Sequence, residues 1–99
     1  MKTNYVGKKV IVRGDRSGLT YGTLESREGA EATISNARRL HYWSGACSIF
    51  QLALTGTTKP NDCRFTVVIP EVEIIDAIEV LPCSDEAIES IEGVKIWKA

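Results

Sequence analysis

The sequence predicts an α+β fold in which a small, strongly curved antiparallel sheet of about five strands packs with two helices. Three observations predict it: short β-branched segments separated by turns, a glycine inside one of these segments, and only two stretches with helical spacing of apolar residues. The chain has 99 residues, 43% of them hydrophobic and 25% charged, which is enough for one hydrophobic core. We therefore expect residues 1–99 to form a single domain.

The first half of the chain predicts a three-stranded meander. Residues 8–13 are β-branched and bounded by glycines, and residues 19–26 form a second such segment. Gly22 lies inside the second segment, where a glycine lets a sheet bend sharply. Residues 30–35 alternate polar and apolar side chains, as a half-buried third strand should.

The alternation of the third strand cannot continue unbroken. It places Ala32 and Ile34 inward, and its continuation would bury Asn36 and Arg38 with them. Burying an arginine without partners is too costly, so we expect a bulge near Asn36–Ala37 that turns the arginines toward solvent or a ligand.

The adjacent Arg38 and Arg39 are expected to have different roles, because neighbouring residues of an extended strand point to opposite faces. One should contact a ligand. The other should form a structural ion pair with an acid from the second half of the chain.

The second half contains both expected helices. In order, it predicts a central helix at 45–55, a strand at 65–69, a strand or bent pair at 72–81, a short helix at 84–92, and an edge strand or docked tail at 94–97. Ser44 is expected to cap the first helix and Gly56 to end it. Asp76 interrupts an otherwise apolar row within residues 72–81.

A specialised stretch lies between the meander and the first helix, at residues 35–46. It combines two arginines, the only histidine, a Tyr-Trp pair and a small-residue turn. Arginine donors suit phosphate or carboxylate, and aromatic faces can stack on a base. The candidate ligand-binding residues are Arg13, Arg16, Tyr21, Asn36, Arg38, Arg39, Tyr42, Trp43 and Ser44.

The charge distribution favours a small anion over a long polyanion. Residues 1–43 carry eight Lys/Arg against four Asp/Glu, and residues 44–99 carry four against nine, for a net charge of −1. A basic first half can attract an anion, whereas a pI near 5.8 argues against duplex DNA as a partner. No apolar run is long enough to cross a membrane or resembles a signal peptide, so we expect a cytoplasmic protein.

Enzymatic chemistry is not expected. The three cysteines form no Cys-x-x-Cys pair, and the single histidine completes neither a metal site nor a catalytic constellation. The sequence also contains no P-loop and no dinucleotide fingerprint. We expect no catalytic residue, no metal and no cofactor.

The sequence resembles a family of small, largely uncharacterised proteins encoded by bacteriophages and prophages. The resemblance covers most of the chain, and its most specific part is an Asn-Ala-Arg-Arg block, residues 36–39, followed by Tyr-Trp-Ser-Gly-Ala, residues 42–46. The family itself supplies little function, but small phage proteins of this sort include many that counter host defences, among them proteins that sequester nucleotide second messengers. The resemblance thus implies a phage protein of the host cytoplasm that binds such a messenger.

A second, weaker resemblance is to SH3- and Sm-like barrels. It covers residues 8–43, where a short basic strand precedes a glycine-containing curved strand. It implies an alternative function, an RNA-binding or protein-interaction module. In either case we expect a homo-oligomer with a composite ligand site, because a domain of this size has little interior to give to a pocket.

Overall fold

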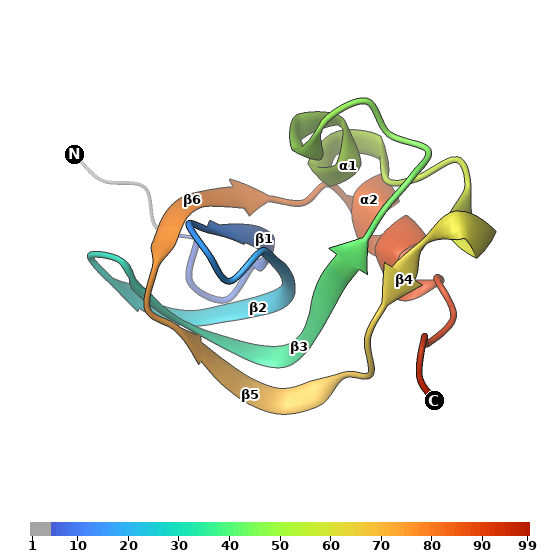
Figure 1. Ribbon diagram of the computed structural model, residues 1–99. Helices are drawn as coiled ribbons and strands as arrows, with labels where there is room; N and C mark the ends of the chain where they lie inside the picture. The colour runs from blue at the N-terminus through green and yellow to red at the C-terminus, as the bar shows by residue number, and fades with distance from the viewer. Residues whose placement is uncertain (1–4) are drawn as a thin grey trace.

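A computed structural model describes residues 5–99, which form one six-stranded antiparallel sheet and two α-helices (Figure 1). The elements are β1 (Lys9–Gly14), β2 (Leu19–Glu28), β3 (Glu31–Tyr42), α1 (Ile49–Thr55), a 3-10 turn η1 (Pro60–Asp62), β4 (Arg64–Phe65), β5 (Ile69–Ile74), β6 (Ala77–Pro82) and α2 (Asp85–Glu92). The strand order is β4-β3-β2-β1-β6, and β5 also pairs with β3. The α+β class is confirmed, with one strand more than expected, and the sheet does not close.

The predicted bulge in β3 is confirmed. Tyr21 pairs with Arg38 and Thr23 pairs with Ser35, so one residue of β2 faces two residues of β3. The extra residue lets Asn36 take a left-handed φ of 48°. Gly22 lies opposite the bulge, where an added Cβ would come within 2.7 Å of the Ser35 carbonyl oxygen. Only glycine fits there, and the sheet bends at this point.

Because of the bend, β3 pairs with two different strands along one of its edges. Its first part pairs with β5 and its last residues pair with β4. Figure 1 shows β3 and β5 curving together, with β4 continuing beside the end of β3. The end of β3 is thereby placed next to α1, α2 and the C-terminal tail.

The sheet separates two buried clusters. Alternation along β1 directs Ile11 to one cluster and Val10 and Val12 to the other. The first cluster lies under α1 and α2, which pack against each other, and includes Phe65 and Leu52. The helices therefore cover one end of the sheet.

The first helix starts later than predicted. Gly45 has a left-handed φ of 86°, which prevents a helix from starting there, and α1 begins at Ile49. Ser48 rather than Ser44 is its N-cap, because the Ser48 hydroxyl accepts a hydrogen bond from Gln51 N at 3.1 Å. The second helix follows the prediction closely, with Ser84 as its N-cap.

Of the two alternatives for residues 72–81, the bent pair is confirmed, because β5 ends at Ile74 and β6 begins at Ala77. The side chain of Asp76, between these strands, organises a loop. Asp76 Oδ2 accepts hydrogen bonds from Arg16 N at 2.7 Å and Ser17 N at 3.0 Å, and Oδ1 accepts one from Ser17 Oγ at 2.7 Å. These bonds favour the charged carboxylate and hold the pKa of Asp76 below its ordinary value of 3.8.

This lowered pKa predicts a contribution to stability that acid removes. The charged carboxylate stabilises the fold above about pH 4, and the contribution is lost as the pH falls through the lower pKa of the folded state. Asp76→Asn should therefore lower the urea midpoint at pH 7, and the difference from the wild type should vanish near pH 2. Glu73→Gln, an exposed change on β5, is the control. A constant difference between pH 7 and pH 2 would contradict this account.

Candidate functional site

The structure buries Arg38, which the sequence offered as a ligand contact. Its side chain is 4% exposed. Nε donates to Thr66 O at 3.1 Å, Nη1 donates to Ile91 O and Val94 O at 3.0 Å each, and Nη2 donates to Phe65 O at 3.2 Å. Burial lowers the pKa of the Arg38 guanidinium, which still remains charged.

The expectation that the bulge turns both arginines outward is therefore wrong for Arg38. The expected acidic partner is also absent from the hydrogen bonds of Arg38. Its guanidinium donates to backbone carbonyl oxygens instead of to a carboxylate. Ile91 and Val94 flank the C-terminus of α2, where the helix dipole favours a positive charge. Arg38 thus joins β3, β4 and α2, and its role is structural.

Tyr21 belongs to the same structural network. Its hydroxyl donates to Glu92 Oε2 at 2.6 Å, and Lys9 Nζ donates to the same oxygen at 2.5 Å. These bonds hold the pKa of Glu92 below its ordinary value, while burial and the neighbouring carboxylate raise the pKa of Tyr21. Tyr21, Arg38 and Asn36 line a small cavity of about 300 Å³ with Lys9 and Glu92. Three predicted site residues therefore lie together, at a place where Glu92 already accepts hydrogen bonds from Tyr21 and Lys9.

Arg13 and Arg16 lie on the β1 side of the sheet. Arg13 forms an ion pair with Glu79 of the neighbouring strand, with 3.5 Å between Nη1 and Oε1. Arg16 is exposed in the loop held by Asp76, to which it gives its backbone N–H.

Arg39 and Trp43 lie closer to the end of β3. Arg39 Nε donates to Thr20 Oγ1 at 3.0 Å, and this half-buried arginine lines a shallow hollow of about 230 Å³. Trp43 packs against the buried cluster under the helices.

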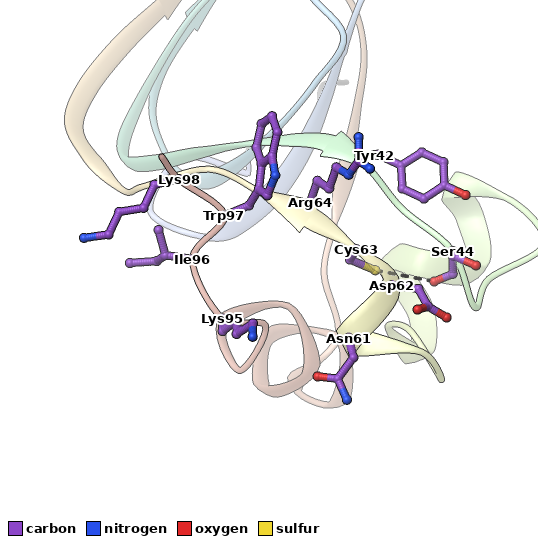
Figure 2. A pocket seen from close by; sticks show the side chains of 10 residues that line it. All are labelled: Tyr42, Ser44, Asn61, Asp62, Cys63, Arg64, Lys95, Ile96, Trp97 and Lys98. Atoms are coloured by element: carbon purple, nitrogen blue, oxygen red, sulfur yellow. Dashed lines mark hydrogen bonds between the residues drawn. The ribbon is translucent and has the colours of Figure 1, made fainter.

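The remaining predicted residues, Tyr42 and Ser44, line an open pocket beside the end of β3. Its volume is about 660 Å³, and Figure 2 shows its lining. The lining comes from the end of β3, from η1 and β4, and from the C-terminal tail: Tyr42, Ser44, Asn61, Asp62, Cys63, Arg64, Lys95, Ile96, Trp97 and Lys98. Segments far apart in the sequence thus build one open site.

The C-terminal tail forms one wall of this pocket because it docks on β4. Ile96 makes an isolated parallel bridge with Phe65, and Trp97 N donates to Phe65 O at 2.9 Å. Val94 is buried beneath the tail. The Trp97 ring also stacks on His41, with ring centroids 5.0 Å apart and planes 11° apart. The expected docked tail is confirmed.

Arg64 is held between two aromatic rings. Its Cζ lies 6.0 Å from the ring centroid of Tyr42 and 5.8 Å from that of Trp97 (Figure 2). Both rings stay about half exposed, at 52% for Tyr42 and 45% for Trp97. Cation–π contacts orient the guanidinium without using its N–H donors. These donors are available for an anion.

The charged side chains that line the pocket give it a net positive charge. Arg64, Lys95 and Lys98 line it, against the single carboxylate of Asp62. The residues that the structure describes form two ion pairs, Lys9–Glu92 and Arg13–Glu79, and neither contains a charge of this pocket. A concave surface with several unpaired cations and flat aromatic faces suits a planar ligand that carries a negative charge.

Sequence reasoning missed four main residues of this pocket: Arg64, Lys95, Trp97 and Lys98. They lie in the acidic second half, so the charge balance of the halves pointed away from them. The signal that could have found them is the Lys-Ile-Trp-Lys tail, where an aromatic ring lies between basic residues.

Residues 5–99 contain neither a metal-type cluster of side chains nor a membrane-spanning helix. No group of three or more His, Cys, Asp or Glu side chains in this part of the chain could hold a metal ion. None of its helices is long and apolar enough to cross a membrane.

Comparison with known proteins adds a family but no function. No curated protein and no solved structure matches the chain. A family model, described as a domain of unknown function, DUF6948, matches residues 7–91, which include β4 and η1 of the pocket but not its C-terminal tail. The chain therefore belongs to the DUF6948 family.

Proposed function

We propose that this domain binds a small anionic ligand with a planar ring, of the nucleotide type, in the pocket around Tyr42, Arg64 and Trp97. The observation that carries the proposal is the combination of three unpaired cations with two half-exposed aromatic faces. A phosphate can take the N–H donors of Arg64 and the ammonium groups of Lys95 and Lys98. A base can stack on the exposed part of the Tyr42 or Trp97 ring.

The proposed role is binding without chemistry, in the host cytoplasm. His41, the only histidine, stacks on Trp97 and serves as part of the aromatic platform. The resemblance to phage proteins makes sequestration of a nucleotide second messenger of host defence the specific form of this proposal. Tight binding that withdraws a messenger needs a pocket and no catalytic residue.

Single-stranded RNA is the second candidate ligand. The half-exposed Tyr42 and Trp97 rings favour it, because proteins bind unpaired bases by stacking them on aromatic side chains. The weaker resemblance of residues 8–43 to SH3- and Sm-like barrels also points to this alternative. An RNA segment would need contacts beyond the pocket, whereas a nucleotide would not.

A thermal-shift screen followed by calorimetry tests the proposal. The probes are cyclic di- and trinucleotides, cyclic ADP-ribose isomers, NAD and short single-stranded RNA. A ligand at 100 times its dissociation constant should stabilise the fold by about 2.7 kcal/mol. Binding should weaken as salt rises, because the cations are exposed. If no nucleotide binds and only RNA does, the second candidate replaces the first.

We also propose that the domain is a homo-oligomer that associates through α1. Phe50 and Leu54 of α1 are 64% and 65% exposed, and they border an apolar groove of about 640 Å³ against β6. The helix carries no charged residue, so a second copy can pack there in a symmetric contact without bringing like charges together. The composite ligand site stays a prediction, since the pocket walls described above come from one chain.

Light scattering should therefore give a mass of two chains or a multiple of it. Leu54→Asp places a carboxylate in the contact and should give single chains that remain folded, because Leu54 is mostly exposed. The matched control is Ile75→Asp, at an exposed position between β5 and β6. A wild-type protein that is monomeric at all concentrations would overturn this assembly.

A further inference from the structure

The pocket contains one feature that works against an anion. Asp62 is the only carboxylate in its lining, and it takes part in neither ion pair of the described residues. The 3-10 turn fixes the backbone at this position, because Asp62 N donates to Lys59 O at 3.0 Å and Cys63 N donates to Pro60 O at 3.3 Å. An unpaired carboxylate beside three cations repels a phosphate at that point and attracts a hydrogen-bond donor.

The pocket therefore has two chemically different parts. Figure 2 shows Trp97, Arg64 and Tyr42 on one side, and Asn61, Asp62 and Lys95 on the other. A mononucleotide has the same division, with phosphate at one end and a base edge at the other. A volume of about 660 Å³ lies within the range of about 300–1,000 Å³ that is usual for small-molecule sites.

Resting on the proposed function, we propose that the ligand carries a guanine base whose Watson–Crick edge is read by Asp62. This edge of guanine presents N1–H and the N2 amino group side by side, a fork that a carboxylate accepts with two parallel hydrogen bonds. Adenine presents a ring acceptor beside its amino group, and that acceptor faces the carboxylate unfavourably. Asn61, next to Asp62, offers an amide that suits the neighbouring carbonyl oxygen of guanine.

The competing interpretation is that Asp62 is only a solvated acid at the rim. In that case Asp62→Asn would remove a repulsive charge and raise the affinity for every nucleotide by the same factor, whatever its base. If Asp62 recognises guanine, the substitution has a different effect. It would raise the affinity for adenine nucleotides and would lower or leave unchanged the affinity for guanine nucleotides.

The experiment is a calorimetric titration of the wild type and Asp62→Asn with GMP, IMP and AMP at one ionic strength. IMP is guanosine monophosphate without the N2 amino group, so it removes one of the two donors only. The wild type should bind GMP at least about fivefold more tightly than IMP, and IMP more tightly than AMP. In Asp62→Asn the ratio of GMP to IMP affinity should fall to about one. Asp85→Asn, an exposed acid at the start of α2, is the control and should leave the ratios unchanged.

Two outcomes overturn the inference in different ways. Equal affinities of the wild type for GMP, IMP and AMP, or ratios that Asp62→Asn leaves unchanged, would disprove guanine reading and leave nucleotide binding intact. Failure of GMP to bind while another probe of the screen does bind would have the same consequence. If neither these nucleotides nor any probe of the screen binds, the proposed function itself fails.

Discussion

Arg38→Ala is expected to lower the free energy of unfolding by about 3–5 kcal/mol, the cost typical of breaking a buried charged network. The substitution removes the donors of four hydrogen bonds to backbone carbonyls and leaves a cavity over Phe65. Three of these carbonyls, those of Phe65, Ile91 and Val94, lie where water cannot reach them easily. Unpaired buried acceptors are costly, and the attachment of α2 to the sheet depends on them.

Urea denaturation followed by circular dichroism measures this effect. Arg38→Lys should recover little stability, because an ammonium group cannot reproduce the planar fork that spans four carbonyls. The matched control is Arg39→Ala, whose guanidinium makes one side-chain hydrogen bond, to Thr20, and which should lose about 1 kcal/mol. Equal losses at the two positions would show that the carbonyl network does not hold the fold together.

Trp97→Ala is expected to weaken ligand binding by about 5- to 150-fold, the range that corresponds to about 1–3 kcal/mol per stacked base. The substitution removes a stacking surface and one of the two rings that orient Arg64. The tail should stay docked, since its hydrogen bond to Phe65 uses the backbone of residue 97. The effect on stability should therefore be small compared with that on affinity.

Calorimetry with the tightest ligand of the screen measures the change, and Trp97→Phe should recover part of the affinity. Ile75→Ala is the control, because it removes an exposed apolar side chain between β5 and β6, away from the pocket and from α1. Arg64→Ala should weaken binding to a similar degree, and the double substitution should cost less than the sum, because the two side chains act together. If Trp97→Ala binds the ligand as tightly as the wild type does, Trp97 is not part of the binding site.

The sequence was sufficient to predict the fold class because local signals were strong. Alternation in β3 and the cost of a buried arginine located the bulge at Asn36–Ala37 correctly. The destination of Arg38 could not be predicted, because its partners at Ile91 and Val94 are more than fifty residues away in the chain. Burial of an arginine is tolerated only when hydrogen-bond acceptors surround its guanidinium. The carbonyl oxygens that do so here are not revealed by any sequence pattern.

The candidate site was predicted less well, for a related reason. The specialised stretch at residues 35–46 does contribute to the pocket, through Tyr42 and Ser44. The cations of the pocket come from β4 and the tail, which docking on Phe65 brings to the end of β3. Net charge counted along the chain hides this arrangement, because a surface is assembled from distant segments and not from halves of the sequence.

The most direct test of nucleotide binding is an NMR titration of the ¹⁵N-labelled protein with the tightest nucleotide of the screen. We predict saturable shifts of the Trp97 indole N–H, the Arg64 side-chain Nε–H and the backbone of residues 61–64 and 95–98, with one dissociation constant for all of them. The signals of α1 should move little. Saturable shifts that map to the α1–β6 groove or to the Tyr21–Glu92 cavity, with the Trp97 and Arg64 signals unmoved, would contradict the proposed site.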